Sequence, residues 1–283
     1  MPEMPEVEVL RRHLEPLIRG RVIRDVEVRR AKIVAPDTPA AFRKRLLGAK
    51  FTGVSRRGKY LLFALRPPGR QEPFQLLGHL GMTGRMFLQP SRAAMPRHTA
   101  VVMRLGKYNF VYEDTRYFGR MSLDTRAVAQ LGPEPLEPDF PVAEFRRVLR
   151  RSAQAIKVKL LDQSLVAGIG NIYASEILFL AGIAPRRAAR SLKAPHMKAL
   201  LQAMRQVLTE AIEGGSTIPL DFAGTGKRDG LFYFGRADGA PDYYTERLRV
   251  YDRAKQPCLR CGQPIRKMVQ AARSTFYCPK CQK

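Results

Sequence analysis

Leu131-Gly-Pro-Glu-Pro-Leu-Glu-Pro-Asp-Phe-Pro141 separates two parts of the chain that differ in their hydrophobic pattern. Proline lacks a backbone N–H and restricts the residue before it, so this stretch suits neither a helix interior nor a central strand. It is therefore the best domain boundary in the sequence. We expect an N-terminal domain over residues 2–130, a helical domain over 131–243 and a cysteine-containing domain over 244–283.

The N-terminal part has the pattern of an antiparallel β-sandwich or barrel preceded by one helix. Apolar residues at positions 7, 10, 14 and 17 share one helical face, which predicts a helix over about 5–17. From 22 to about 123, short β-like runs are separated by glycine, proline and basic turns, as strands are. The predicted strands include 51–54, 60–65, 74–80, 100–105 and 109–112.

The part beyond the boundary has helical spacing. It predicts helices over 142–149, 156–161, 171–180 and 194–212. Val166-Ala-Gly-Ile-Gly-Asn171 lies between two of them as a glycine-containing turn, where Asn171 can cap the next helix and the first backbone N–H groups can bind a DNA phosphate. An ordinary helix cap without a ligand is the alternative. A polar, glycine-rich segment follows over 214–242.

All four cysteines lie in the last 26 residues. Cys258-x2-Cys261 and Cys278-x2-Cys281 are sixteen residues apart, a spacing typical of a zinc site in which each pair presents two sulfurs to the metal. Free buried thiols or redox pairs are the alternative. Because protein sulfur fills all four positions, we expect one structural Zn²⁺ whose binding supplies folding energy to a module too small for its own core.

The charge indicates a polyanionic partner. The chain carries 50 Lys and Arg against 25 Asp and Glu, a formal net charge of +25, and such a field favours nucleic acid. General solubility or adaptation of a whole proteome is the alternative. No run approaches the roughly 18 apolar residues of a membrane span, and no signal peptide opens the chain, so we expect a soluble, cytoplasmic protein without a membrane partner.

Pro2 follows the initiator methionine, and small second residues usually allow that methionine to be removed. The free secondary amine would have an ordinary pKa of about 7.7–8.0, far below that of lysine. It can therefore attack an electrophilic sugar carbon and form an iminium ion. Physical reasoning alone makes this only feasible, because most proteins that begin with Met-Pro make no such use of the proline.

A series of motifs in the same order along the chain resembles the formamidopyrimidine-DNA glycosylase and endonuclease VIII family. They begin with Met1-Pro2-Glu3-Met4-Pro5-Glu6-Val7-Glu8 and Arg11-Arg12 and span nearly the whole chain. The others are Gly58-Lys59-Tyr60, His79-Leu-Gly-Met82-Thr-Gly84, Asp114-Thr-Arg116-Tyr-Phe118-Gly119, Leu161-Asp-Gln163, Gly168-Ile-Gly-Asn-Ile-Tyr173, Gly214-Gly-Ser-Thr217 and Arg273-Ser-Thr-Phe-Tyr-Cys278-Pro-x-Cys281.

The resemblance implies an α+β multidomain fold: an antiparallel β-sandwich with a flanking helix, a helix–two-turn–helix domain and a zinc hairpin finger. It also implies the excision of an oxidised base followed by strand cleavage. Pro2 would be the nucleophile, Glu3 the acid and base that assists opening of the sugar ring, and Lys59 a phosphate contact and proton donor in β-elimination. Arg273 would clamp a phosphate and assist δ-elimination.

Contacts with damaged double-stranded DNA follow from the same resemblance. The family assigns Met82, Arg116 and Phe118 to the gap that an everted nucleotide leaves, and a thioether, a planar cation and an aromatic ring can each stack between bases. Core packing of Met82 and Phe118 is the alternative. His98 and Lys157 are expected phosphate contacts, and Asn171 is expected to bind DNA as part of the glycine turn.

The substrate is expected to be an oxidised purine, such as 8-oxoguanine or a formamidopyrimidine, and the protein is expected to act as a monomer without a nucleotide cofactor. Two alternatives are an endonuclease VIII-like preference for oxidised pyrimidines and a non-catalytic zinc-containing protein that binds damaged DNA. The segment 218–242 is longer than is usual in the family and leaves the lesion open. Ala272 stands where glycine is common, and Tyr117 where a second arginine is common.

Overall fold

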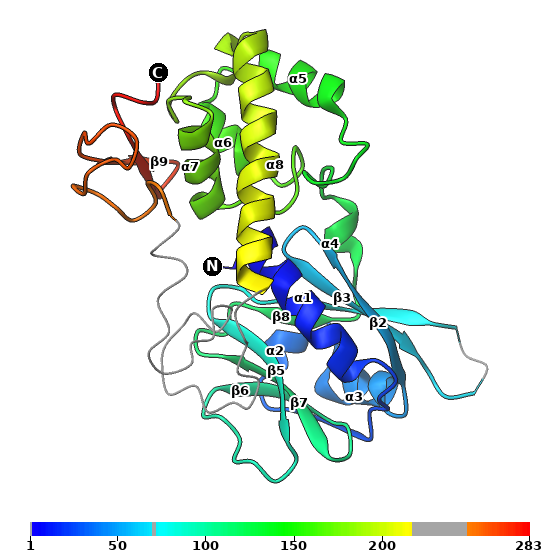
Figure 1. Ribbon diagram of the computed structural model, residues 1–283. Coiled ribbons are helices and arrows are strands. Elements are labelled where there is room, and N and C mark those ends of the chain that lie inside the picture. The colour runs from blue at the N-terminus through cyan, green and yellow to red at the C-terminus, as the bar shows by residue number, and fades with distance from the viewer. Residues whose placement is uncertain (1, 70–71, 217–247) are drawn as a thin grey trace. The chain divides into compact units, whose positions relative to one another are not determined.

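Residues 2–69, 72–216 and 248–283 are described by the computed structural model (Figure 1). The chain divides into two units, each with its own set of internal contacts. The first unit contains Pro2 and residues 6–129, and the second contains residues 3–5, 130–214 and the described residues from 248 onward. The change of unit at 129/130 adjoins the proline-rich stretch. The predicted change of domain at 243/244 lies outside the described residues.

The first unit is a sandwich of two antiparallel sheets. Within the described residues, one sheet has the strand order β1-β6-β7-β5 and the other β2-β3-β4-β8. Three phenylalanine rings pack in its core: Phe51 lies 6.1 Å from Phe63 and 6.3 Å from Phe110, between ring centroids. The strands are β1 (Asp25–Val28), β2 (Lys50–Arg57), β3 (Tyr60–Arg66), β4 (Phe74–His79), β5 (Gly84–Pro90), β6 (Thr99–Arg104), β7 (Tyr108–Asp114) and β8 (Arg120–Ser122).

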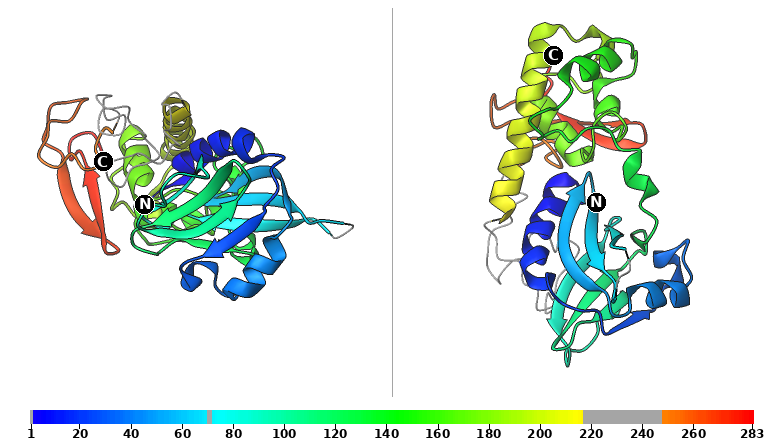
Figure 2. Two further views of the ribbon diagram at one scale, coloured as in Figure 1. Left: turned by 90° about the horizontal axis from the view of Figure 1, so that it is seen from below. Right: turned by 90° about the vertical axis from the view of Figure 1, so that its right-hand side faces the viewer.

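Helix α1 (Met4–Ile18) confirms the predicted N-terminal helix. It lies against the sandwich beside β2 and β3 (Figure 2). Its apolar residues are buried, with Val7, Leu10 and Leu14 all inaccessible to solvent. The helix is tied to β2 at its far end, where the Arg19 side chain donates a hydrogen bond of 2.9 Å to the carbonyl of Thr52.

The range 22–123 contains the expected strands and also short helices that the pattern did not indicate. Two short helices, α2 (Ala31–Val34) and α3 (Pro39–Leu46), lie in that range, and a third, α4 (Arg126–Ala129), follows it. A signal for α3 was present, because Thr38 accepts the N–H of Ala41 at 3.2 Å as a cap and Pro39 occupies the first turn. Strands β1, β5 and β8 were not predicted. β5 is buried along most of its length and therefore lacks an alternating pattern.

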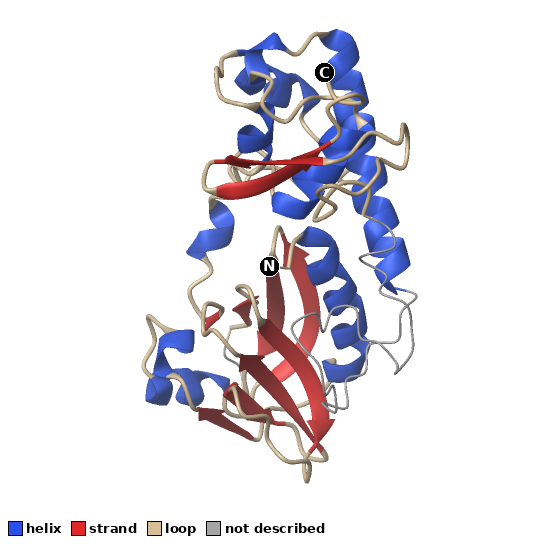
Figure 3. Ribbon diagram, turned by 90° about the vertical axis from the view of Figure 1, so that its left-hand side faces the viewer, coloured by secondary structure: helices blue, strands red, loops and turns tan. Residues whose placement is uncertain are grey.

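The second unit is helical, as predicted, and carries a two-stranded ribbon (Figure 3). Its core contains Phe145, Leu160, Ile177 and Met204, each fully or almost fully buried. The helices are α5 (Val142–Arg150), α6 (Ile156–Leu160), α7 (Asn171–Leu180) and α8 (Ala194–Ser216), with a short 3-10 helix, η1 (Ala189–Ser191), before α8. The ribbon strands are β9 (Arg266–Gln270) and β10 (Arg273–Tyr277). No helix in the described ranges is long and apolar enough to cross a bilayer.

Candidate functional site

Glu3 caps a helix that is distant in sequence. Its carboxylate accepts N–H groups of Gly170 at 2.7 Å, Ile172 at 2.8 Å and Tyr173 at 3.2 Å, all at the start of α7. The residue is 1% exposed. These N–H groups carry the positive end of the helix dipole, which suits a negatively charged acceptor. Glu3 is thereby fixed to the glycine turn within the second unit.

The predicted role of Asn171 as the cap of α7 was wrong. The predicted phosphate site at this helix start stays a prediction. The residue that precedes α7 is Gly170, and the acceptor for its first N–H groups is Glu3 of this chain. Gly170 has to be glycine, because a Cβ there would lie 2.3 Å from the Glu3 carboxyl carbon. The turn itself is held by Gln163, which accepts the N–H of Gly168 and donates to the carbonyl of Ile169.

Asn171 instead joins a polar network with Lys157 and strand β10. The Lys157 ammonium donates to the Asn171 side-chain oxygen at 2.8 Å, to Thr275 Oγ1 at 2.8 Å and to the carbonyl of Ser274 at 3.2 Å. Asn171 also donates to that carbonyl at 2.9 Å. Lys157 is 1% exposed. This network connects α6, α7 and the ribbon, and it places two predicted DNA contacts side by side.

Burial lowers the pKa of Lys157 to about 8. The charge of Arg273 adds to this effect, and the charge of Glu3 opposes it. Two other predicted site residues, Glu3 and Arg273, therefore act on the charge of Lys157 within the second unit. Arg273 is exposed at the first position of β10.

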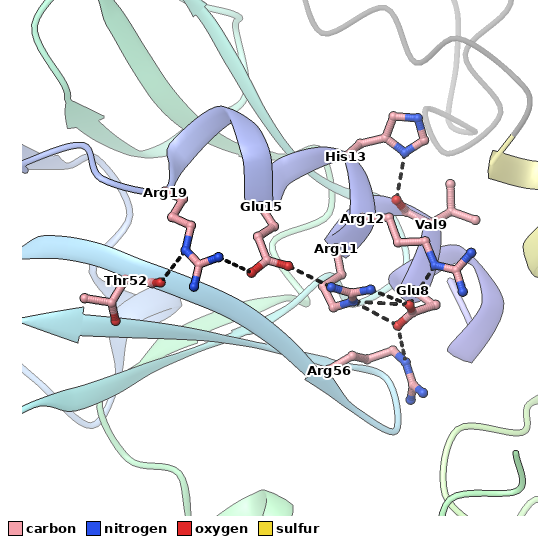
Figure 4. Close-up of polar contacts among 9 residues, drawn as sticks. All are labelled: Glu8, Val9, Arg11, Arg12, His13, Glu15, Arg19, Thr52 and Arg56. Atoms are coloured by element: carbon pink, nitrogen blue, oxygen red, sulfur yellow. Dashed lines mark hydrogen bonds and ion pairs between the residues drawn. The ribbon is translucent and has the colours of Figure 1, made fainter. Parts of the chain in front are cut away.

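Lys59 lies at the tip of the β2–β3 hairpin and is mostly buried. An ion-pair network leads from α1 to this tip (Figure 4). Glu8 accepts hydrogen bonds from Arg11, Arg12 and Arg56, and Arg56 in turn donates to the carbonyl of Gly58 at 3.0 Å. Burial opposes ionisation of Glu8, but the three arginines outweigh it and lower its pKa below the ordinary value. The network fixes the turn that presents Lys59.

His79 lies beside Lys59 in the same unit. The two sheet partners Tyr60 and His79 have ring centroids 4.7 Å apart. Burial, together with the charges of Lys59 and Arg120, lowers the pKa of His79 to about 4. The neutral ring accepts the N–H of Gly81 through Nδ1 at 3.2 Å, which fixes the start of the loop that carries Met82.

The predicted wedge side chains are exposed, so core packing of Met82 and Phe118 is wrong. Met82 is 42% and Phe118 53% exposed. The guanidinium carbon of Arg116 lies 4.8 Å from the centre of the Phe118 ring. His98 is partly buried and contacts the Tyr117 ring edge to face, at 6.4 Å. Met82, His98, Arg116 and Phe118 all lie in loops of the first unit.

The four cysteines meet at one point. The sulfurs of Cys258, Cys261, Cys278 and Cys281 all lie within 4.8 Å of one another, as ligands of one tetrahedral ion do. Four thiolates this close together would repel one another, so a cation is needed to hold them in place. The residues fit a structural zinc ion.

The zinc module is attached to α7 by a small core and by a buried acid. Phe179 of α7 packs with Val250, Ile265 and Phe276. Glu176 on the same helix accepts the N–H groups of residues 249, 250 and 251 at 2.8–2.9 Å. Burial raises the pKa of Glu176, and the three N–H groups oppose this. The module is therefore oriented by the helix that Glu3 caps.

Sequence reasoning gave no role to four residues. They are Arg56, Glu176 and Thr275, described above, and Asp114, which is described below. Glu176 had a signal, because a single carboxylate inside the apolar run Ile172–Leu180 needs partners when it is buried. The other three become visible only when distant segments are brought together.

Comparisons with known proteins cover the whole chain. The N-terminal domain of formamidopyrimidine-DNA glycosylase matches residues 1–121, its H2TH domain matches 131–221, and the zinc finger found in FPG and IleRS matches 255–283. The formamidopyrimidine-DNA glycosylase of Desulfitobacterium hafniense is 41% identical over the full length of both chains.

Solved structures agree with the sequence comparison. Lactococcus lactis Fpg in complex with DNA containing N7-benzyl-Fapy-dG has a TM-score of 0.86 and 34% identity, over 100% of both chains. The same enzyme in complex with DNA containing an oxidised pyrimidine gives the same values. The chain therefore belongs to the formamidopyrimidine-DNA glycosylase family.

Proposed function

We propose that this chain removes oxidised purines, such as 8-oxoguanine and formamidopyrimidines, from double-stranded DNA and then cleaves the strand at the resulting abasic site. Full-length similarity to formamidopyrimidine-DNA glycosylases supports the class of reaction. The observation that carries the assignment is Glu3, buried and held by three N–H groups of α7 directly beside Pro2. An amine and an acid are thereby held at adjacent positions, as the reaction requires.

Pro2 is the proposed nucleophile. Once Met1 has been removed, its nitrogen attacks C1′ of the damaged nucleotide and loses its proton, while the glycosidic bond breaks and the base leaves with a proton. The C1′–O4′ bond then breaks, O4′ takes a proton, and an iminium ion forms between the nitrogen and C1′. The resulting iminium ion acidifies the C2′ proton, whose loss breaks the C3′–O bond. Loss of a further sugar proton breaks the C5′–O bond. Water then releases the enzyme.

Glu3, Lys59 and Arg273 are the proposed assistants. Glu3 protonates the ring oxygen as the sugar opens and moves protons during elimination. Lys59 contacts a flanking phosphate and supplies a proton in β-elimination, and the buried hairpin tip limits the positions that its ammonium can reach. Arg273 neutralises a phosphate and assists δ-elimination.

The base has to leave the stack before Pro2 can reach its sugar. We propose that Met82, Arg116 and Phe118 fill the gap, a role that their exposure and mutual proximity support. His98 and Lys157 are proposed phosphate contacts, and Asn171 is a proposed DNA contact. Since the Lys157 and Asn171 side chains already bond within the protein, their part in binding would include the orientation of β10.

Oxidised pyrimidines are a second candidate substrate class. The complex of Lactococcus lactis Fpg with DNA containing an oxidised pyrimidine supports it, because that enzyme matches this chain over its full length. The segment 218–242, whose length leaves the lesion open, lies outside the described residues. Lesion choice therefore has to be measured directly.

We further propose that the protein acts as a monomer with one structural zinc ion and no nucleotide cofactor. The zinc ligands would be the four clustered cysteines. A chromosomal substrate implies action where the chromosome lies, which is the cytoplasm in a bacterial cell.

Covalent trapping tests this function. The protein is incubated with duplexes that contain 8-oxoguanine or thymine glycol, and borohydride is added to reduce any iminium ion. We expect an adduct, and faster trapping on 8-oxoguanine. One extra residue in front of Pro2 should abolish the adduct, whereas Pro5→Ala, a matched change in the same segment, should retain it. Absence of an adduct with both lesions would instead indicate a DNA-binding protein without activity.

A further inference from the structure

We propose that Asp114 is a positioning residue that fixes the loops carrying Met82, Arg116 and Phe118 before DNA is bound. This inference rests on the proposed function, since it concerns how the wedge is held while a base is everted. All the residues involved belong to the first unit.

The Asp114 carboxylate joins two loops. The residue ends β7 and is fully buried. Oδ1 accepts the hydroxyl of Thr83 at 2.6 Å and the N–H of Arg116 at 3.2 Å, and Oδ2 accepts the N–H of Gly119 at 2.8 Å. Thr83 follows Met82 directly, and Arg116 and Gly119 enclose Phe118. One side chain therefore bonds next to every proposed wedge residue.

Asp114 also reaches the loop with His98. Its own N–H donates to the carbonyl of His98 at 3.1 Å. In the sheet, Asp114 is paired with Gly84, the first residue of β5, which follows the Met82 loop. The Met82 loop, the Phe118 loop and the His98 loop are thus all tied to the end of β7.

The two wedge loops touch through their backbones. A Cβ on Gly81 would lie 2.5 Å from the backbone nitrogen of Gly119 and 2.6 Å from the carbonyl carbon of Phe118. Gly81 itself has a φ of +60°. Such close contact lets neither loop move without the other. The Met82 loop and the Phe118 loop therefore form a single tip, and the Asp114 carboxylate bonds to both of its parts.

This tip contains a strained residue that has to be held. Tyr117 has a φ of +52°, in the left-handed region that is strained for a residue other than glycine. It lies between the two N–H groups, of Arg116 and Gly119, that Asp114 accepts. Arg30 also packs over its ring at 4.9 Å. Without the carboxylate, the turn would relax and Phe118 would lose its defined direction.

The consequence is that the tip carrying Met82 and Phe118 is preorganised for binding to DNA. Met82 and Phe118 are about half exposed at the tip, so packing of their own side chains fixes them only in part. If the tip is rigid, its conformational entropy is lost during folding and not when the DNA is opened. Asp114 should therefore matter most when the lesion has to be extracted from intact stacking.

Variants of both partners test the inference. Asp114→Asn places an amide donor against an N–H or hydroxyl donor, and Thr83→Val removes the hydroxyl that joins the loops. Thr83→Ser keeps this hydroxyl and should therefore retain the activity that Thr83→Val loses. Excision is measured in single turnovers on two 8-oxoguanine duplexes. One is fully paired, and in the other the lesion faces an abasic-site analogue between mismatches.

On the paired duplex we expect Asp114→Asn and Thr83→Val to slow excision by about tenfold or more, which is a barrier of about 1.4 kcal/mol. On the disrupted duplex the loss should be about twofold or less, and Thr83→Ser should resemble the parent on both. An equal loss on both duplexes, or no loss on the paired duplex, would overturn the inference. A parent protein that excises from neither duplex would overturn the proposed function itself.

Discussion

Single side chains in this protein are fixed by partners that are far away in sequence. Glu3 bonds to Gly170 across 167 positions, and Thr83 bonds to Asp114 across 31. Each acceptor is a buried carboxylate, and a buried carboxylate without donors would be strongly destabilising. Polar contacts of this kind specify one geometry, whereas apolar packing tolerates several.

His79 gives the protein a pH dependence. Its pKa in the folded protein is about 4, below the ordinary 6.5, so the unfolded chain binds more protons between these values. The contribution of His79 is therefore fully present above pH 6.5 and is lost as the pH falls towards 4. His79→Asn keeps an acceptor for Gly81 but does not titrate.

Urea unfolding at pH 7 and at pH 4.5 measures this effect. The free energy of unfolding should fall more in the parent than in His79→Asn, by an amount on the order of 2 kcal/mol. Carboxylates titrate in both proteins and cancel in the comparison. Equal losses in the two proteins would show that the His79 ring is not buried in its neutral form.

Among the elements, long helices and the cysteine module could be predicted from the sequence, and short elements could not. The helix predicted over 171–180 is α7 without any shift, because its apolar residues are continuous. Helix α2 has four residues and no side-chain cap, so neither hydrophobic periodicity nor a capping residue predicts it from the sequence. The site needed contacts between elements: the glycine turn suggested a phosphate site, yet its N–H groups bind Glu3.

The turn of the zinc ribbon stores strain. Ala271 and Ala272 connect β9 to β10 with φ values of +47° and +58°, where glycine and asparagine are usual. Each costs about 1–2 kcal/mol in this region. The turn directly precedes Arg273, the proposed phosphate clamp.

Ala272→Gly should therefore stabilise the ribbon. The strain energy that is removed exceeds the cost of the extra entropy that glycine gives to the unfolded chain. The free energy of unfolding should therefore rise by up to about 1 kcal/mol. Hydrogen exchange of the β9 and β10 amides measures it as slower exchange. Val269→Thr, in the exposed part of β9, is a matched control that leaves the turn unchanged. Faster exchange in Ala272→Gly would contradict the strain.

At the scale of the whole molecule, charge and metal act together. The net charge of +25 attracts DNA without choosing a sequence. In the zinc module the basic residues also have fixed positions, because the four clustered cysteines hold the module in one fold. The sequence alone predicted both features, since neither depends on how the rest of the chain packs.

Zinc removal tests this combination. Release of the metal by a mercurial reagent and a chelator should free one zinc ion per chain and expose Ile265 and Phe276. We expect weaker binding to an abasic-site duplex and a shallower dependence of affinity on salt. Amides of β2 and β3 should remain protected from exchange. Unchanged binding by the zinc-free protein would remove the module from the DNA interface.

The zinc module is held at both of its ends. At its start, the N–H groups of residues 249–251 donate hydrogen bonds to Glu176. At the C-terminus, the Gln282 side chain donates to the carbonyl of Ile183, and the Lys283 N–H donates to the carbonyl of Gly182. Its orientation on α7 is therefore independent of the segment 217–247 that connects it to α8. Insertions and deletions in that segment can accumulate during evolution without moving the finger.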